Sequence, residues 1–240
     1  MVKHVIFLLC LLGGRVLILA QPVFTNPGIP DSESFEIDEQ VDPTIGRVHT
    51  KINVTQGEQN DTKFYSIEVN EGNFFKNEIK IKYSDLTTIS EKRTDLKTGK
   101  IIQSYEKRGD TVRFFNAEKE VDKAFVTKET NIYSPLAFYF SFRGFPFEEE
   151  GKQVSFKSYI YEYGDVLTMN LVNSSKKTVT VKVGTFECYV LELSVGGWQS
   201  LFAPDTYYLY FTVTKPHIFV KYEEKINGTW STDELLRYTK

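Results

Sequence analysis

Cysteine is scarce in this chain of 240 residues, and that scarcity limits the classes of protein that it can represent. Of the two cysteines, Cys10 lies in an apolar N-terminal segment and Cys188 in a strand-like segment. If the N-terminal segment is removed as a signal peptide, Cys188 alone remains and no internal disulfide can form. The sequence therefore argues against a small secreted scaffold held together by disulfides. We expect Cys188 to be a buried, unreactive thiol.

Recognisable catalytic and cofactor-binding motifs are also missing. The sequence has no G-x-S-x-G, no phosphate-binding loop and no dinucleotide fingerprint. His49 and His217 are far apart and have no Cys, Asp or Glu at ligand spacing, whereas a metal site needs three or four converging ligands. The run Glu148–Glu150 is typical of a solvated surface, and no carboxylate pair stands out for acid–base catalysis. We therefore expect neither an enzyme nor a bound metal or other cofactor.

Neither sign of charge is in large excess, whereas aromatic residues are plentiful. The net charge is −3 and charges of both signs are interspersed, so no basic stripe is present and we expect no nucleic-acid partner. The 14 Tyr and 19 Phe favour pleated surfaces. Composition therefore favours a mainly β protein.

The N-terminus has the pattern of an export signal. Lys3 and His4 precede an apolar stretch that leads to a cleavage site after Ala20, so residues 1–20 are predicted to be a signal peptide. A membrane anchor is the alternative, although Arg15 interrupts the stretch and it is short for a spanning helix. Residues 21–34 hold three Pro and one Gly, and we expect a flexible linker there.

From Phe35 onward polar and apolar residues alternate with the period of two that is typical of β-strands. Lys63–Asn70 and Glu78–Tyr83 show it most clearly, and Val166–Asn173 and Thr178–Val183 are expected as two further strands. The spacing of turn residues predicts roughly ten to eleven strands in all. We expect residues 35–240 to form a single domain, a curved antiparallel sheet making a half-open barrel around one short central helix.

The helix is predicted within the stretch Asn131–Phe147, NIYSPLAFYFSFRGFPF, which is almost wholly apolar. Ser134 can cap a helix and Pro135 suits its first turn, so the helix should lie inside Ser134–Gly144. A membrane-contacting loop is the alternative. If the stretch is a helix, side chains on one side of it should pack into the concave face of the sheet, namely Leu136, Phe140 and Phe142.

Two groups of residues resemble a known family. Tyr133–Lys152 is similar to the central signature of the DUF3108 family of exported bacterial proteins, a short helix followed by a small apolar patch and a Gly. The second signature of that family is a G-T-F strand, an aromatic strand ending before a Pro, and a strand carrying V-K-x-E. It resembles Val181–Leu193, Tyr207–Phe211, Lys215–Glu223 and Glu234–Leu236.

The resemblance implies a fold related to the periplasmic lipoprotein carriers LolA and LolB, in which a curved sheet surrounds a helix and encloses an apolar cavity. It also implies location in the periplasm or cell envelope of a bacterium. The helix differs from the family pattern, because Ser134-Pro135 replaces the usual Asp before the Leu and aromatic residues dominate. The interior could thus be open or plugged by the aromatic side chains Phe138, Tyr139, Phe140 and Phe142.

Candidate ligand-binding residues follow from this picture. Arg143 ends the apolar helix, where it either stabilises the helix end or meets an anionic head group at a cavity mouth. Trp198 and Phe202 belong to an apolar loop that either contacts a partner or lipid, or folds back over the end of the sheet. With Phe138, Phe140 and Phe142, these are the predicted ligand-binding residues. The cavity walls, chosen on an assumed register, are Ile79, Ile81, Phe156, Leu191 and Tyr208.

Three functions compete at this stage. The first is an exported, non-enzymatic envelope protein that binds a lipid, an acyl chain or another apolar ligand in the half-barrel. The second is a structural or protein-interaction module of the envelope, with a solidly packed interior and a protein partner. The third is an enzyme on the same scaffold, because a fold does not fix a function.

Overall fold

The computed structural model describes residues 22–42, 46–161, 164–196, 206–226 and 229–240. The described residues form a single sheet of fifteen strands and one short helical segment. The strands are β1 Ser32–Asp42, β2 Gly46–Gln59, β3 Thr62–Glu71, β4 Phe75–Lys82, β5 Thr88–Asp95, β6 Ile101–Arg108, β7 Thr111–Asn116, β8 Val121–Val126, β9 Ile132–Tyr133, β10 Gln153–Ile160, β11 Asp165–Val181, β12 Gly184–Val195, β13 Thr206–Thr212, β14 Phe219–Ile226 and β15 Thr229–Thr239.

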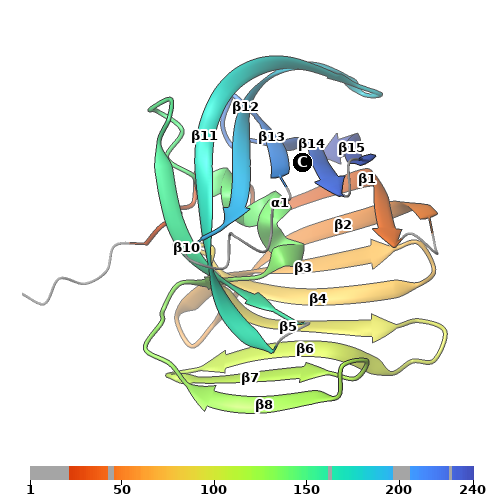
Figure 1. Cartoon of the computed structure of the whole chain (residues 1–240), viewed down its shortest axis with the longest axis vertical. Coiled ribbons are helices and arrows are strands. Elements are labelled where there is room, and N and C mark those ends of the chain that lie inside the picture. Colours follow the sequence, from red (N-terminus) through yellow and green to blue (C-terminus); the bar gives the residue numbers. More distant parts are fainter. Residues whose placement is uncertain (1–21, 43–45, 162–163, 197–205, 227–228) are drawn as a thin grey trace, which may run out of the picture.

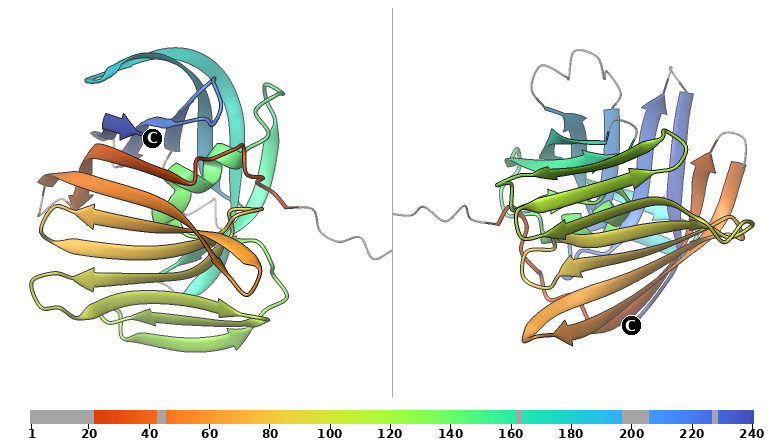
Figure 2. Two further views of the ribbon diagram at one scale, coloured as in Figure 1. Left: turned by 180° about the vertical axis from the view of Figure 1, so that it is seen from behind. Right: turned by 90° about the horizontal axis from the view of Figure 1, so that it is seen from below.

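The sheet is a long meander whose two halves meet where the first strand pairs with the last. Its order is β8-β7-β6-β5-β4-β3-β2-β1-β15-β14-β13-β12-β11-β10-β9. Every neighbouring pair is antiparallel except β9 and β10, which are parallel. Figure 1 shows the sheet curling so that its two halves face each other across the helix, and Figure 2 shows the same curl from two other sides. The predicted mainly β, curved antiparallel architecture is confirmed.

Side chains, rather than strand pairing, join β10 and the residues beside it to β5 and β6 in the opposite half of the sheet. Tyr159 of β10 stacks on Tyr105 of β6, with ring centroids 4.1 Å apart. Glu91 of β5 is buried and accepts hydrogen bonds from the hydroxyls of Ser134, Tyr159 (2.5 Å) and Tyr161 (2.8 Å). Burial of its carboxyl raises the pKa of Glu91. We call this cluster of five residues the seam.

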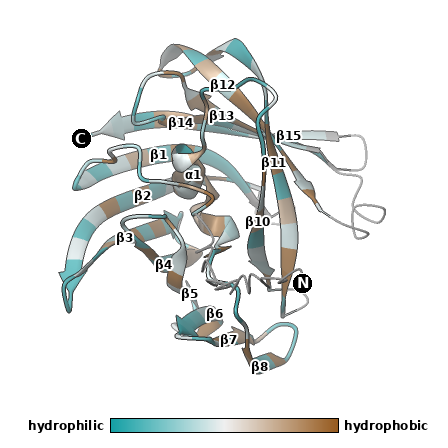
Figure 3. Cartoon of the chain, turned by 90° about the vertical axis from the view of Figure 1, so that its left-hand side faces the viewer, coloured by the Kyte–Doolittle hydropathy of each residue, from teal (hydrophilic) through white to brown (hydrophobic). Residues whose placement is uncertain are grey.

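The helical segment lies where the sequence predicts it. It consists of η1 Pro135–Ala137, α1 Phe138–Ser141 and η2 Phe142–Gly144. The hydroxyl of Ser134 accepts a hydrogen bond from the backbone N–H of Leu136 at 3.1 Å, as expected of an N-cap, and Pro135 occupies the first turn. Figure 3 shows α1 between the two halves of the sheet, on whose strands hydrophilic and hydrophobic bands alternate.

The segment expected to be a flexible linker is instead packed over its described residues, 22–34. Phe24 is fully buried, and its ring centroid lies 5.4 Å from that of Phe142. The backbone N–H of Thr25 donates to Gly144 O at 3.1 Å, and a Cβ at position 144 would lie only 2.5 Å from Thr25 O. The linker prediction was wrong because Pro and Gly content indicates irregular backbone, which here is held by two buried apolar side chains, Phe24 and Ile29.

The long hairpin of β11 and β12 was predicted incompletely. Val166–Asn173 and Thr178–Val183 belong largely to one strand of 17 residues, bent by a register shift opposite β12 between Asn173 and Ser175. Near the turn of this hairpin, Nζ of Lys182 lies 3.6 Å from Oδ2 of Asp38 in β1. The hairpin therefore reaches across the outer face of β13, β14 and β15, which lie between β12 and β1 in the sheet. A second apolar cluster is buried on that face, formed by Val181, Cys188, Val190, Tyr210 and Val220. Burial raises the pKa of the Cys188 thiol to about 12, which confirms a buried thiol there.

Candidate functional site

An open cavity of about 400 Å³ lies on the concave face, beside the helical segment and against β1 and strands β10 to β15. It combines apolar walls with several polar groups, which is the usual composition of a small-molecule site. Its lining residues are Glu39, Gln40, Pro135, Leu136, Phe138, Tyr139, Ser158, Ile160, Met169, Leu193, Val195, Tyr207, Leu209, Tyr222, Glu224 and Asp233.

Most of the wall is apolar because successive strands present their inward positions to it. Met169 of β11, Leu193 of β12 and Leu209 of β13 are buried members of the main core. Strand alternation places their neighbours on the outer face. Leu136 and Phe138 supply the opposite wall from the helical segment. A hydrocarbon chain in this cavity would lie between the helical segment and the sheet.

One end of the cavity is acidic. Asp233 of β15 is buried; its Oδ1 accepts from the backbone N–H of Gln40 at 2.9 Å and its Oδ2 from the Tyr139 hydroxyl at 2.8 Å. Glu224 of β14 accepts a hydrogen bond from the Tyr222 hydroxyl at 2.9 Å. These partners fix two carboxylates at the boundary between the apolar wall and the strand ends.

Glu39 of β1 is the third carboxyl at this end. Its carboxyl is buried beside the hydroxyl of Thr50, whose hydrogen bond lowers the pKa of Glu39. Burial, reinforced by the negative charges of Glu71 and Asp233, raises the pKa of Glu39 from 4.5 to about 8. Burial likewise raises the pKa of Asp233 from 3.8 to about 6, and the nearby charge of Glu224 adds to the shift. The three carboxyls therefore lie close enough to repel one another when ionised. We call Glu39, Glu224 and Asp233 the acidic end.

Positive charge near the acidic end is already paired. None of the described lining residues is Lys, Arg or His. Arg93 lowers the pKa of Glu39, but its Nη1 and Nη2 donate to the two carboxylate oxygens of Glu71 at 2.7 and 2.6 Å. Arg47 donates to Thr232 O and Asp38 O. The cations nearest to the acidic end, Arg47 and Arg93, are thus paired with the carboxylates of Asp38 and Glu71.

The predicted anion partner, Arg143, lies elsewhere. Its side chain is fully buried and forms an ion pair with Glu33 of β1, whose side chain is also fully buried. Its Nε donates to Pro216 O at 2.9 Å, and its guanidinium lies over the rings of Phe35 and Phe140. Arg143 therefore ties the helical segment to β1, which confirms the structural alternative. Its assignment as a head-group ligand at a cavity mouth was wrong, because that assignment needed an exposed guanidinium.

The three phenylalanines that were predicted to bind a ligand lie in different surroundings. Phe138 lines the cavity, whereas Phe142 is fully buried among Phe24, Phe138 and Phe156. Phe140 borders an apolar void of about 20 Å³ on the other side of the helical segment, too small for more than about one water molecule. Over the described residues, the interior is thus plugged at Phe140 and Phe142 and open beside Phe138.

Of the five residues predicted to form the cavity walls, four face inward, but none of the five lines the cavity. Ile79, Ile81, Phe156 and Leu191 are buried in the main core, and they do not line the cavity. Tyr208 points to the outer face, where it packs on the second apolar cluster, because the inward positions of β13 are Tyr207 and Leu209. The register assumed for β13 was therefore off by one residue. Trp198 and Phe202 lie outside the described residues.

The carboxyls of the acidic end were missed by the sequence reading, although a signal was present. Asp233 stands two positions before Leu235, and Glu39 two positions after Ile37. Leu235 and Ile37 are both buried in the core. Strand alternation alone therefore places Asp233 and Glu39 on the same inward face of the sheet. A charged residue at an inward strand position is uncommon and is worth examining as a site.

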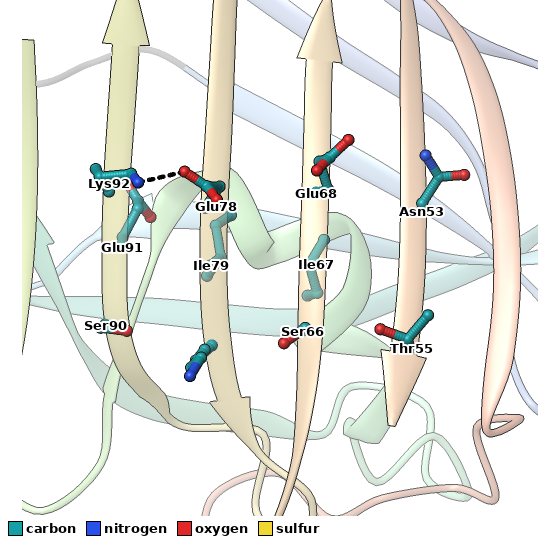
Figure 4. A pocket seen from close by; sticks show the side chains of 11 residues that line it. Asn53, Thr55, Ser66, Ile67, Glu68, Glu78, Ile79, Ser90, Glu91 and Lys92 are labelled. Atoms are coloured by element: carbon teal, nitrogen blue, oxygen red, sulfur yellow. Dashed lines mark ion pairs between the residues drawn. The ribbon is translucent and has the colours of Figure 1, made fainter. Parts of the chain in front are cut away.

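A larger depression, of about 520 Å³, lies on the outer face of β2 to β5. Figure 4 shows its side chains, most of them polar, standing in rows on neighbouring strands, with an ion pair between Lys92 and Glu78. Glu68 pairs in the same way with Lys76 at 2.7 Å. Paired charges on an open sheet face are typical of solvated surface, so we do not assign a ligand here.

The described residues contain neither a membrane-spanning helix nor a candidate metal site. No helix in that part of the chain is long and apolar enough to cross a bilayer. Nor do its His, Cys, Asp and Glu side chains form a group of three or more that could hold a metal ion.

Comparisons with known proteins add little. No protein-family model matches the chain, and no curated protein matches it. Several chains of solved structures are similar, and one of them matches over 86% of this chain and 96% of its own, with 8% sequence identity and a TM-score of 0.42. It is the crystal structure of a beta-barrel-like protein of a domain of unknown function, DUF1849, from Brucella abortus. At this level of similarity the match carries no information about activity.

Proposed function

We propose that this chain is an exported, non-enzymatic binding protein of a bacterial cell envelope that holds an apolar ligand in the cavity beside the helical segment. The observation that carries the proposal is the apolar wall shared by Leu136, Phe138, Met169, Leu193 and Leu209. A volume of about 400 Å³ falls within the range of small-molecule pockets. Protein interiors are normally close-packed, so an open apolar groove is not needed to stabilise the core.

The finer parts of the proposal rest on sequence resemblance. We propose a relationship to the DUF3108 family and to the LolA and LolB carriers, supported by the two sequence signatures and by a curved sheet around a short helix. Export rests on the N-terminal pattern. N-terminal sequencing of protein recovered from the periplasm or envelope should begin near Gln21, whereas an intact Met1 in a cytoplasmic pool would refute export.

Binding of primary alcohols of increasing chain length tests the proposed function. Each added CH₂ that enters the cavity should contribute about 0.8 kcal/mol, which tightens binding about fourfold, until the cavity is full. Alcohols avoid any bias from head-group charge. If no alcohol binds at any length, the proposal fails and the alternative, an envelope interaction module with a protein partner, becomes the better account.

A further inference from the structure

We propose that one end of the half-open barrel docks on the surface of a phospholipid bilayer, with Phe74, Leu96, Ile101 and Trp230 at the level of the lipid head groups. We call these four residues the apolar rim. The inference goes beyond the proposed function, because it names the surface with which the protein would exchange an apolar ligand. Vesicle binding tests it without any ligand in the cavity.

Exposed apolar side chains gather at this end of the sheet. Six large hydrophobic side chains are exposed among the described residues, and four of them form the apolar rim, with exposed fractions of 43% for Phe74, 43% for Leu96, 46% for Ile101 and 52% for Trp230. They lie in the turn from β3 to β4, at the turn from β5 to β6, and next to the start of β15. Antiparallel pairing places these three positions at the same end of the sheet.

The two turns that carry most of the apolar rim lie side by side (Figure 1). The backbone N–H of Leu96 donates to Phe74 O at 2.8 Å, so the turn after β5 is held against the turn after β3. The backbone N–H of Asp95 donates to Lys100 O at 3.0 Å, which closes the second turn beside Ile101. Single exposed apolar residues are ordinary on a protein surface, whereas a group of them on neighbouring turns is typical of an interaction site.

Lysines flank the apolar rim. Lys97 and Lys100 are exposed in the same turn as Leu96. Lys225 is also exposed, and its Nζ lies 5.8 Å from the centroid of the Trp230 ring. Aromatic and aliphatic side chains beside lysines are the usual means of binding a bilayer surface, because the apolar groups enter the interface while the ammonium groups face lipid phosphates.

Acidic residues at this end leave the apolar rim clear. Asp95 accepts hydrogen bonds from two backbone N–H groups of its own turn, at 2.8 and 2.9 Å. Asp233 is buried in the cavity, where it accepts from Tyr139. The turn between β7 and β8 holds Glu118 and Glu120 and no large apolar residue, so we place the boundary of the docking surface at β6.

The cavity reaches the same end of the sheet. Ile160 and Val195 are the last residues of β10 and β12, and both line the cavity. On its other side lies Glu39, which is close enough to Glu71 for the two charges to interact. The backbone N–H of Phe74 donates to Glu71 O at 3.1 Å, so the apolar rim stands beside the cavity. A bilayer docked there would face the cavity, and an apolar ligand would pass between them without crossing bulk water.

The experiment measures co-flotation of the mature chain with vesicles of phosphatidylethanolamine and phosphatidylglycerol. The chain begins at Gln21, because the apolar segment before it would bind vesicles by itself, and the described fold begins at residue 22. We expect the wild type to float with the vesicles. Phe74→Ser combined with Leu96→Ser should weaken this binding at least about tenfold, since two large apolar side chains no longer enter the interface.

Two further variants make the test specific. Val126→Ser combined with Val183→Ser is the matched control, because these valines are 76% and 41% exposed and lie away from the apolar rim, at the end of β8 and in the turn from β11 to β12. It should leave vesicle binding unchanged. Lys97→Glu combined with Lys100→Glu should weaken binding at least about tenfold, because each lysine near an anionic surface contributes about 1 kcal/mol and reversal adds repulsion. All substituted positions are exposed, and circular dichroism establishes that the variants fold.

The outcomes decide the inference and the proposed function separately. A wild type that does not float, or a control variant that loses as much binding as Phe74→Ser with Leu96→Ser, would overturn the inference. So would a wild-type dimer that those two substitutions dissociate in the absence of vesicle binding, since the apolar rim would then contact a second copy of the chain. Neither Phe74 nor Leu96 lines the cavity, so both results leave the test with 1-dodecanol intact. Vesicle binding without any dodecanol binding would refute the proposed function alone.

Discussion

The hydroxyl of Tyr139 donates a 2.8 Å hydrogen bond to Oδ2 of Asp233, across 94 residues of sequence. This bond joins the helical segment to β15, and both residues line the cavity. It brings together the two features of the site, because Tyr139 belongs to the segment that supplies the apolar wall and Asp233 to the acidic end. The arrangement of the site therefore depends on the docking of one short helix against the concave sheet.

The pH dependence of stability tests the buried state of Glu39. Its pKa in the folded protein, about 8, lies above its ordinary value of 4.5. A folded-state pKa above the unfolded one means that the group favours the folded state at low pH and loses this contribution as pH rises toward 8. Between pH 6 and 8 the wild type should therefore lose free energy of unfolding relative to Glu39→Gln. Urea denaturation across this range measures the difference.

A suitable control for that experiment is Glu118→Gln, because the side chain of Glu118 is largely exposed. It should show the same dependence on pH as the wild type. A constant difference in the free energy of unfolding between the wild type and Glu39→Gln from pH 6 to 8 would show that Glu39 is not buried.

The ion pair between Arg143 and Glu33 should be costly to break from one side. Arg143→Met leaves the carboxylate of Glu33 buried without its cation, and the expected loss is about 3–5 kcal/mol of the free energy of unfolding. Arg113→Met provides a control, because Arg113 and Asp122 form an exposed pair that should contribute about 1 kcal/mol or less. Equal effects of the two substitutions in chemical denaturation would contradict the burial of Arg143.

Phe140 tests whether the helical segment is buried core or a membrane-contacting loop. Its side chain is buried against the sheet, so Phe140→Ala should reduce the free energy of unfolding by about 3–5 kcal/mol. Phe74→Ala, at a ring that is 43% exposed, should change it by about 0.5 kcal/mol or less. A near-zero effect at Phe140, measured by urea denaturation, would instead favour a membrane-contacting loop.

The seam offers a test in two tyrosines that stack on each other. Tyr159→Phe removes a hydroxyl that donates to the buried carboxyl of Glu91, and should cost about 1–2 kcal/mol. Tyr105→Phe removes a buried hydroxyl that has no partner among the described residues, so stability should stay the same or rise. Thermal unfolding of both variants measures the contrast. The reverse order would mean that Glu91 does not join β5 to β10.

Local patterns in the sequence were enough to predict the elements but not their arrangement. Alternation identified most strands, and Ser134 with Pro135 fixed the start of the helical segment. Short or irregular strands such as β9 were missed, since two residues carry no period. The burial of Phe24 was missed for a related reason, because it depends on contacts with residues more than a hundred positions away.

The site was harder to predict than the fold. Arg143 was correctly singled out, but its partner Glu33 lies 110 residues away, and nothing local to either residue indicates the pair. Tyr208 and Tyr207 differ by one position, so a single step in register exchanged the outward residue for the one that lines the cavity. The alternation of the strands predicts only that Glu39 and Asp233 face inward, once Ile37 and Leu235 are assigned to the core.

The most direct test of the account is to block the cavity and measure binding of 1-dodecanol. Leu193→Trp places a larger side chain in the cavity wall, whereas Glu192→Trp places the same side chain on the opposite face of the same strand. Circular dichroism would first establish that both variants fold. The account predicts that Leu193→Trp weakens dodecanol binding at least about tenfold and that Glu192→Trp leaves it unchanged. Equal binding by both variants and the wild type, or no binding by the wild type, would contradict it.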